Sequence, residues 1–192
     1  MDESGKSPGQ DGLSKELFES HWDLLVGNVM DFIRSFEITT ELSQPTKTAV
    51  TVPLYKKGQT QCLPNYRPIS LLNTVYKVIA KVLANRTRPV IHKVISDEQY
   101  GFISERRLAD AVATVADVIV AENRGKEDWL LLLVDFQKAY DSVLRGYLFR
   151  SMRRMGFPNL YVRWVEGLHE GAVTRICMNG RLGELVGMRK GG

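Results

Sequence analysis

The hydrophobic positions change their period several times along the 192 residues. From Ser14 to Phe36 apolar side chains recur at steps of three and four, which predicts an amphipathic helix. Residues 48–55 are β-branched and alternating, and residues 66–72 are apolar again after a polar loop. Two strands joined as a hairpin are therefore expected after the first helix.

The middle of the chain returns to helical spacing. Asn73 suits the N-cap of a helix that Pro89 ends or kinks. Further helices are predicted at 108–122, at 144–155 and from Pro158 to about residue 169, the first of them with Gly125 as its C-terminal stop.

Strand-like patterns also occupy the second half. Residues 129–134 are apolar throughout and bounded by charge, which predicts a buried strand. A terminal hairpin is expected from two apolar stretches, 173–178 and 182–188, around an Asn179-Gly180 turn. The combined pattern predicts an α+β fold.

Charge is distributed unevenly. Residues 1–49 carry 4 basic and 9 acidic side chains, whereas residues 50–107 carry 10 basic and 3 acidic ones. A basic middle segment favours a polyanionic partner, and a solvated Lys/Arg face explains it equally well.

Other classes of protein are disfavoured by composition. The apolar run at 129–134 is far too short to cross a bilayer, so no membrane partner is expected, and residues 1–4 do not resemble a secretory signal. Cys62 and Cys177 are too few and too far apart for a zinc cluster or a disulfide framework. An intracellular location, nuclear or cytoplasmic, is the expectation.

Asp135 is the sharpest candidate for chemistry because it ends the predicted buried strand. A carboxylate beside so much apolar surface needs compensation, and a hard cation such as Mg²⁺ provides it. An Asp that merely caps the next helix is at least as common for this pattern alone.

The basic hairpin is the second candidate. Lys56 and Lys57 lie on its loop and Arg67 lies on its return strand. Two ammonium groups and a guanidinium suit a triphosphate, although a solvated hairpin tip explains the charges without any ligand. Residues 187–192 form a Gly-rich basic end that allows close approach of a nucleotide or a template strand. As a sign of function this pattern is weaker still, because a Gly-rich turn needs no ligand.

In this order the segments resemble the reverse transcriptase domain of LINE-like (non-LTR) retrotransposons. The resemblance covers roughly residue 6 to the end and rests on six motifs: Ser7-Pro8-Gly9-Gln10-Asp11-Gly12, Pro53-Leu54-Tyr55-Lys56-Lys57-Gly58, Asn65-Tyr66-Arg67-Pro68-Ile69-Ser70, Lys81-Val82-Leu83-Ala84-Asn85-Arg86, Gln99-Tyr100-Gly101-Phe102 with Arg106, and Val134 to Asp141. It implies a fragment of a right-hand polymerase, with helical and β-hairpin fingers over 1–125 and the first part of the palm over 126–192.

The resemblance also implies a site. Asp135 would be the first catalytic aspartate of a two-metal nucleotidyl transfer site, and the Phe136 carbonyl would add a metal ligand. The ions would be Mg²⁺, with Mn²⁺ as the alternative. Tyr140 would exclude a ribose 2′-hydroxyl, whereas Asp141 is assigned a structural role in the turn.

The remaining implied contacts concern substrates. Lys56 and Arg67 would hold the incoming triphosphate, with Lys57 an equal alternative to Lys56. The implied partners are an RNA template, a DNA primer, a deoxynucleoside triphosphate, and the remaining palm and thumb of a parent polyprotein.

Departures from the family pattern leave alternatives open. Ser104-Glu105 replaces Pro-Gly, and Gln10 replaces Pro in the opening motif. The family's Tyr/Phe-x-Asp-Asp is expected beyond this segment, since no Asp-Asp pair occurs in the 192 residues. The fragment is therefore expected to be inactive alone, and a non-catalytic nucleic-acid-binding remnant of a retroelement is the alternative. An unrelated phosphotransfer domain is disfavoured because Gln137 stands where many phosphatases have a second Asp.

Overall fold

The structure is a computed structural model that describes residues 7–122, 130–136 and 138–188. The chain divides into two compact units. The first contains Met1–Lys81 with Tyr140–Gly192, and the second contains Val82–Ala139. The helix Thr74–Thr87 (α4) begins in the first unit and ends in the second.

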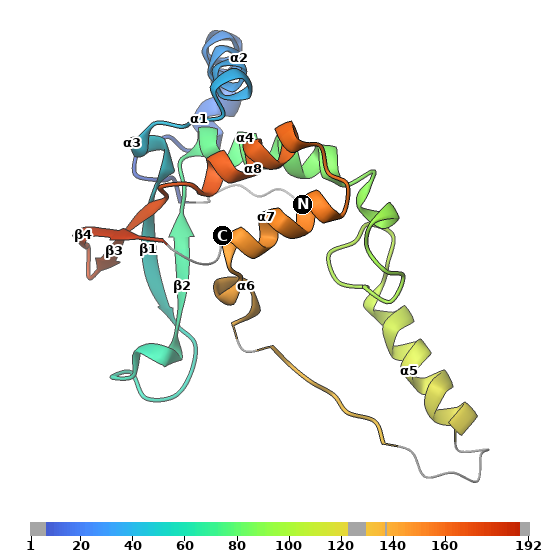
Figure 1. Ribbon diagram of the computed structural model, residues 1–192. Coiled ribbons are helices and arrows are strands. Elements are labelled where there is room, and N and C mark those ends of the chain that lie inside the picture. Colours follow the sequence, from blue (N-terminus) through green and yellow to red (C-terminus); the bar gives the residue numbers. More distant parts are fainter. Residues whose placement is uncertain (1–6, 123–129, 137, 189–192) are drawn as a thin grey trace. The chain divides into compact units, whose positions relative to one another are not determined.

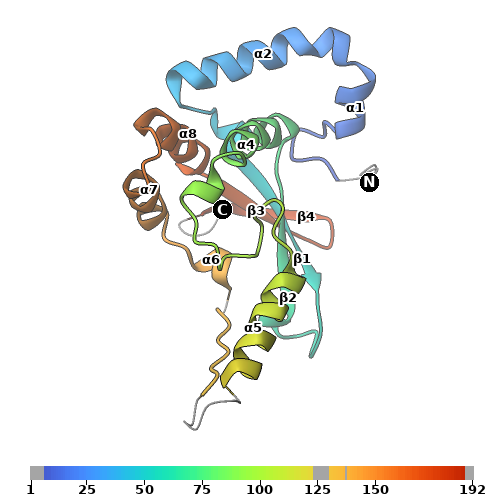
Figure 2. The same cartoon turned by 90° about the vertical axis from the view of Figure 1, so that its right-hand side faces the viewer.

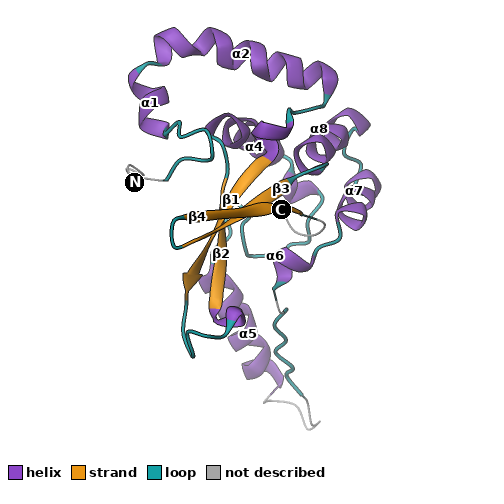
Figure 3. Cartoon of the chain, turned by 90° about the vertical axis from the view of Figure 1, so that its left-hand side faces the viewer, coloured by secondary structure: helices purple, strands orange, loops and turns teal. Residues whose placement is uncertain are grey.

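A four-stranded sheet organises the first unit, in the order β2-β1-β3-β4. The strands are β1 (Thr48–Tyr55), β2 (Tyr66–Leu71), β3 (Val173–Met178) and β4 (Arg181–Gly187). β1 pairs antiparallel with β2 and parallel with β3, and β3 pairs antiparallel with β4 (Figure 3). The two predicted hairpins are thus confirmed, and the parallel pairing joins them into one sheet.

Helices of the first unit surround this sheet. They are α1 (Lys15–Ser20), α2 (Trp22–Thr39), α3 (Gln44–Lys47), α6 (Ala139–Ser142), α7 (Arg145–Arg154) and α8 (Asn159–His169), with a 3-10 turn η1 (Leu63–Asn65) between β1 and β2. α7 and α8 lie side by side in two views (Figures 1 and 2), and the Arg153 guanidinium is 2.6 Å from the Glu166 carboxylate across them. The predicted first helix is present as two, because the chain breaks at His21.

Buried aliphatic and aromatic side chains from these elements form the core of the first unit: Phe18, Val29, Phe36, Leu42, Ala49, Ile79, Val162 and Leu168. α8 approaches the end of α2 closely, since a Cβ on Gly167 would lie 2.0 Å from the Thr40 carbonyl oxygen. The Trp164 indole also donates to the Glu37 carbonyl at 3.1 Å. A glycine at 167 is therefore required for this packing.

The second unit contains the end of α4, a 3-10 turn η2 (Ile91–Lys93) and α5 (Leu108–Glu122). α5 has the predicted bounds, while the predicted stop at Gly125 lies outside the described residues. Arg106 holds the preceding loop by donating to the Ser96 and Gln99 carbonyls and to the Asp97 carboxylate.

The predicted buried strand at 129–134 is wrong for the residues that the structure describes. Residues 130–136 form neither helix nor strand, and Leu130 and Leu133 are 90% and 80% exposed. An apolar run becomes a buried strand only when another strand satisfies its backbone, and no described strand pairs with this one.

The described helices include none that is both long enough and apolar enough to cross a lipid bilayer. Mixed helix and sheet confirm the predicted α+β class.

Candidate functional site

Register places two of the predicted cations on one face of the β1–β2 hairpin. Leu54 lies directly opposite Arg67. The Lys56 amide continues the ladder by donating to the Asn65 carbonyl at 2.9 Å, so Lys56 occupies the same face as Leu54. Lys57 lies beyond this last pair, beside Gly58, whose φ is 95°. All three cationic side chains are exposed, which keeps them available to a ligand.

The loop that carries the lysines is held by its own side chains. The Tyr55 hydroxyl donates to the Gly58 carbonyl at 2.6 Å, and the Tyr66 hydroxyl donates to the Thr60 carbonyl at 2.9 Å. The two rings meet edge to face with centroids 5.7 Å apart. The Asn65 amide donates to the Gln59 carbonyl at 2.8 Å. These bonds restrict the loop conformation and so fix the position of the Lys56 backbone.

The predicted catalytic residues lie partly in the other unit. Asp135 and Phe136 belong to the exposed segment 130–136 of the second unit, and Phe136 is 80% exposed. Tyr140 lies on α6 in the first unit and is 68% exposed. Within the described ranges no three His, Cys, Asp or Glu side chains are grouped so that they could hold a metal ion. Asp135 and the Phe136 carbonyl alone therefore do not make up a two-metal donor set.

A cavity of about 460 Å³ lies over one face of the sheet, which we call the hydroxyl face because Thr51, Ser70 and Thr174 share it. The Thr51 hydroxyl lies 3.0 Å from that of Ser70 and 2.7 Å from that of Thr174. Asp141, which we expected to have a structural role in the turn, lines the same cavity. Sequence reasoning did not identify this hydroxyl chain, because the pairing of β1 with β3 is not visible locally.

Two polar side chains in the lining of this cavity bond to the C-terminus of α8. The Tyr76 hydroxyl donates to the Leu168 carbonyl at 3.1 Å, and the Arg145 guanidinium donates to the His169 carbonyl at 2.5 Å. Burial raises the pKa of Tyr76, and the positive charge of Arg145 partly opposes that shift. Burial lowers the pKa of Arg145 in turn. Both groups are partly desolvated where they cap the end of α8, and the positive charge of Arg145 is favourable at a helix C-terminus.

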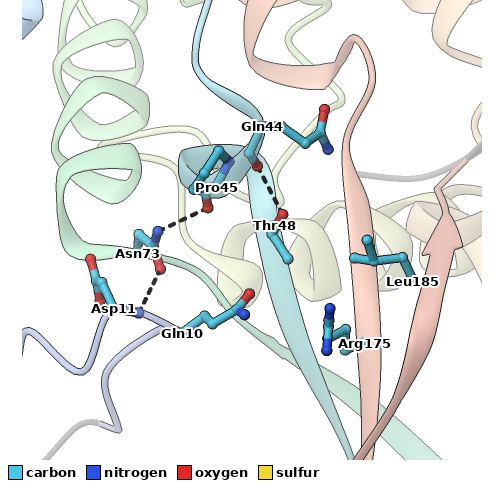
Figure 4. Close-up of a pocket in the computed structure, with 8 residues that line it drawn as sticks. All are labelled: Gln10, Asp11, Gln44, Pro45, Thr48, Asn73, Arg175 and Leu185. Carbon is cyan, nitrogen blue, oxygen red and sulfur yellow. Dashed lines mark hydrogen bonds between the residues drawn. The ribbon is translucent and has the colours of Figure 1, made fainter.

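The opposite face of the sheet, called the arginine face, carries Arg67 and Arg175. Arg175 lies opposite Val50, which has the same parity along β1 as Leu54, the partner of Arg67. A second cavity of about 390 Å³ opens beside Arg175 (Figure 4). Its lining comprises Gln10, Asp11, Gln44, Pro45, Thr48, Asn73, Arg175 and Leu185.

Asn73 ties the N-terminal turn to this cavity. Its side-chain oxygen accepts from the Asp11 amide at 3.4 Å, and its side-chain nitrogen donates to the Pro45 carbonyl at 3.1 Å (Figure 4). A Cβ on Gly9 would lie 2.4 Å from the same oxygen, which accounts for glycine in the opening motif. Asn73 precedes α4 as predicted, and its side chain also fastens the opening motif to the first unit.

Arg175 is the residue of this region that sequence reasoning missed. The only local signal is one arginine within the otherwise uncharged strand β3. The Gly-rich basic end was expected to approach a nucleotide or a template strand. Its residues 189–192 lie outside the described residues.

Known proteins resemble the chain over most of its length. The sequence profile described as "Reverse transcriptase (RNA-dependent DNA polymerase)" matches residues 54–191. A 149 kDa protein of transposon TX1 from Xenopus laevis is 30% identical over 174 residues, which are 91% of this chain and 13% of that protein.

Two Drosophila melanogaster proteins show the same pattern at lower identity. The RNA-directed DNA polymerase from mobile element jockey is 25% identical over 82% of this chain and 18% of its own length. The Pol polyprotein of type-2 retrotransposable element R2DM is 24% identical over 91% of this chain and 16% of its own length. The chain thus spans less than a fifth of each of these three relatives.

Proposed function

Because this chain belongs to the reverse transcriptase (RNA-dependent DNA polymerase) family, we propose that it forms part of a polymerase that copies retrotransposon RNA into DNA. In this proposal residues 1–125 are the fingers and residues 126–192 are the first part of the palm. The parent's partners are an RNA template, a DNA primer, a deoxynucleoside triphosphate, and further palm and thumb segments.

The placement of Lys56 and Arg67 on one face of the hairpin carries the proposal. A guanidinium grips phosphate oxygens in pairs, and an ammonium adds a point charge beside it. The loop bonds of Tyr55, Tyr66 and Asn65 hold that arrangement before a ligand arrives. We assign the triphosphate to Lys56 and Arg67, with Lys57 contributing less because it lies beyond the paired residues.

Asp135 and the Phe136 carbonyl supply one side of the proposed catalytic centre. Polymerases of this kind use paired divalent ions to stabilise the attacking and leaving oxygens, and Mg²⁺ suits carboxylate and phosphate oxygens. The described residues do not complete such a donor set. Further carboxylates are therefore required, and no step of the reaction is assigned to a metal held by this chain alone.

Tyr140 has the proposed role of discriminating between sugars. Its ring is exposed on α6, five residues after Asp135, and so is available to lie against the 2′ edge of a nucleotide. A bulky ring there excludes a hydroxyl by a steric clash, which is a common way to reject a near-identical substrate.

Calorimetric titration of the chain with a deoxynucleoside triphosphate, and separately with inorganic tripolyphosphate, tests the triphosphate assignment. Lys56→Gln and Arg67→Gln should each weaken both ligands by about tenfold, since each removes one charge-assisted bond. Lys57→Gln should weaken them less. Lys15→Gln, a lysine paired with Glu19 on α1, is the matched control and should bind as the wild type does. Equal affinity of Lys56→Gln, Arg67→Gln and Lys15→Gln would contradict the assignment.

A further inference from the structure

Arg175 lacks any partner for its side chain within the part of the chain that the structure describes. Its Nε atom is buried from solvent and forms no hydrogen bond there. The residue is half-buried between β1 and β4, so its charge is partly removed from water. A buried Nε–H without an acceptor is unfavourable, and an anion that enters the cavity would accept a hydrogen bond from it.

Most other polar groups around the cavity are already satisfied by the fold. Asn73 uses its oxygen and its nitrogen on Asp11 and Pro45. The Thr48 hydroxyl donates to the Gln44 carbonyl, and the Gln44 amide donates to the Gly171 carbonyl.

Two donors remain for a ligand. The Asp11 carboxylate accepts from the Leu13 amide and is turned away from Arg175 in Figure 4. The Gln10 amide instead extends into the cavity from the side opposite Arg175 (Figure 4). Arg175 and Gln10 are thus the two donors that face the cavity without a bond among the described residues.

The surrounding face indicates which anion would bind. Arg67 and Arg175 share the arginine face at positions opposite Leu54 and Val50. The two positions are four residues apart along β1 and lie on strands either side of it. With a rise of about 3.3 Å per residue and a strand spacing of about 4.8 Å, their Cα atoms are roughly 16 Å apart. That span corresponds to a few nucleotides of a strand that rises about 3.4 Å per nucleotide.

We propose that Arg175, together with Gln10, binds a backbone phosphate of a nucleic-acid strand that crosses the arginine face away from the hairpin tip. The proposal rests on the function proposed above, because a nucleic-acid strand presents a phosphate at every nucleotide across such a span. Gln10 stands where the resemblance has proline, so its amide donor is a feature of this chain. The cavity is in this view a phosphate subsite distinct from the triphosphate grip of Lys56 and Arg67.

Salt-dependent binding of a fluorescent single-stranded oligoadenylate RNA tests the proposal. One phosphate contact contributes about 0.7 to the slope of log K against log salt for a single strand. Arg175→Gln should lower the slope by that amount, and Arg175→Lys should retain most of it. Gln10→Ala should weaken binding without changing the slope, since it removes no charge. Arg34→Gln, an exposed arginine paired with Asp31 on α2, is the matched control and should leave the slope unchanged.

Stability separates a binding role from a structural one. Removal of the unsatisfied Nε donor should leave the melting temperature of Arg175→Gln unchanged or raise it. A lower melting temperature would assign Arg175 to the fold and overturn the proposal.

The binding outcomes are equally distinct. Equal slopes for Arg175→Gln and Arg34→Gln, with the wild type still binding RNA, would overturn the Arg175 subsite alone. If Arg175→Gln lost tripolyphosphate binding but kept RNA binding, Arg175 would be assigned to a nucleotide, and the proposed nucleic-acid subsite would also be overturned. Absence of RNA binding by the wild type would overturn both this proposal and the function on which it rests.

Discussion

The β1–β2 hairpin and the segment 130–136 were both expected to contain strands, and only the hairpin does. β1 has an alternating sequence that includes a proline, yet it pairs with β2 on one side and β3 on the other. Residues 130–134 are aliphatic without interruption, yet they are exposed and unpaired within the described chain.

The difference shows that backbone partners decide strand formation more than apolar content does. Each residue of β1 lies opposite a residue of β2 or β3, so the strand gains ladder hydrogen bonds as well as burial of alternate side chains. The segment 130–136 presents Asp135 and Phe136 without such support, so the two halves of the proposed site differ in how firmly the chain holds them.

The largest expected effect of this difference is on catalysis. The 192-residue chain should show no primer extension on a poly(rA) template with an oligo(dT) primer, because the described residues give Asp135 no metal-binding group to join and its segment no strand partner. Incorporation of labelled deoxythymidine triphosphate in the presence of Mg²⁺ measures this.

An extended chain of the proposed parent that includes the Asp-Asp motif expected downstream is the positive control. Extension by the 192 residues that Asp135→Ala abolishes would show that a second carboxylate of this chain serves the metal ions. It would also remove the contrast between the two segments.

The next effect concerns stability. Phe36 is 2% exposed in the core of the first unit, and truncation of a buried phenylalanine costs about 3–5 kcal/mol. Phe36→Ala should therefore lower the free energy of unfolding by that amount. Leu133→Ala, at a leucine that is 80% exposed, should change it by less than about 0.5 kcal/mol. Urea denaturation followed by circular dichroism compares the two. A large loss in Leu133→Ala would mean that the segment is packed in solution.

The smallest effect is on the alkaline side of the stability profile. Because burial raises the pKa of Tyr76 above its ordinary value of 10.0, the folded chain keeps this proton when the unfolded chain loses it. Its contribution is complete below that pH and falls as pH rises beyond it. Tyr76→Phe should cost about 1 kcal/mol near neutral pH through the lost bond to the Leu168 carbonyl, and should flatten the alkaline decline. Melting temperatures between neutral and alkaline pH decide it, and parallel declines of the two proteins would contradict the assignment.

Local patterns predicted most of the elements. The interpretation as a LINE-like, non-LTR reverse transcriptase fragment is confirmed by the family match and by the transposon relatives. Asn179 and Gly180 both have positive φ, 51° and 77°, as a two-residue hairpin turn between β3 and β4 requires. The parallel pairing of β1 with β3 was not foreseen, because it joins residues more than a hundred positions apart and leaves no local signal.

For the candidate site, too, local features could be predicted from the sequence and long-range ones could not. Lys56 and Arg67 were identified from charge and motif, and their shared face follows from hairpin register, which is local. The roles of all the predicted site residues remain proposals: Lys56, Lys57, Arg67, Asp135, Phe136 and Tyr140. Arg175 could not be found from the sequence, since the burial of its Nε atom without a hydrogen-bond partner among the described residues depends on the assembled sheet.

The parallel pairing also constrains how the protein is made. Thr51 must wait for Thr174, 123 positions later, before their hydroxyls can meet. At roughly 5–20 residues per second, a ribosome needs about 6–25 s to synthesise the intervening chain. During that interval β1 has one neighbour and an open edge, the arrangement most exposed to wrong pairing. Each nascent copy therefore passes through a period of risk that a faster-closing topology would avoid.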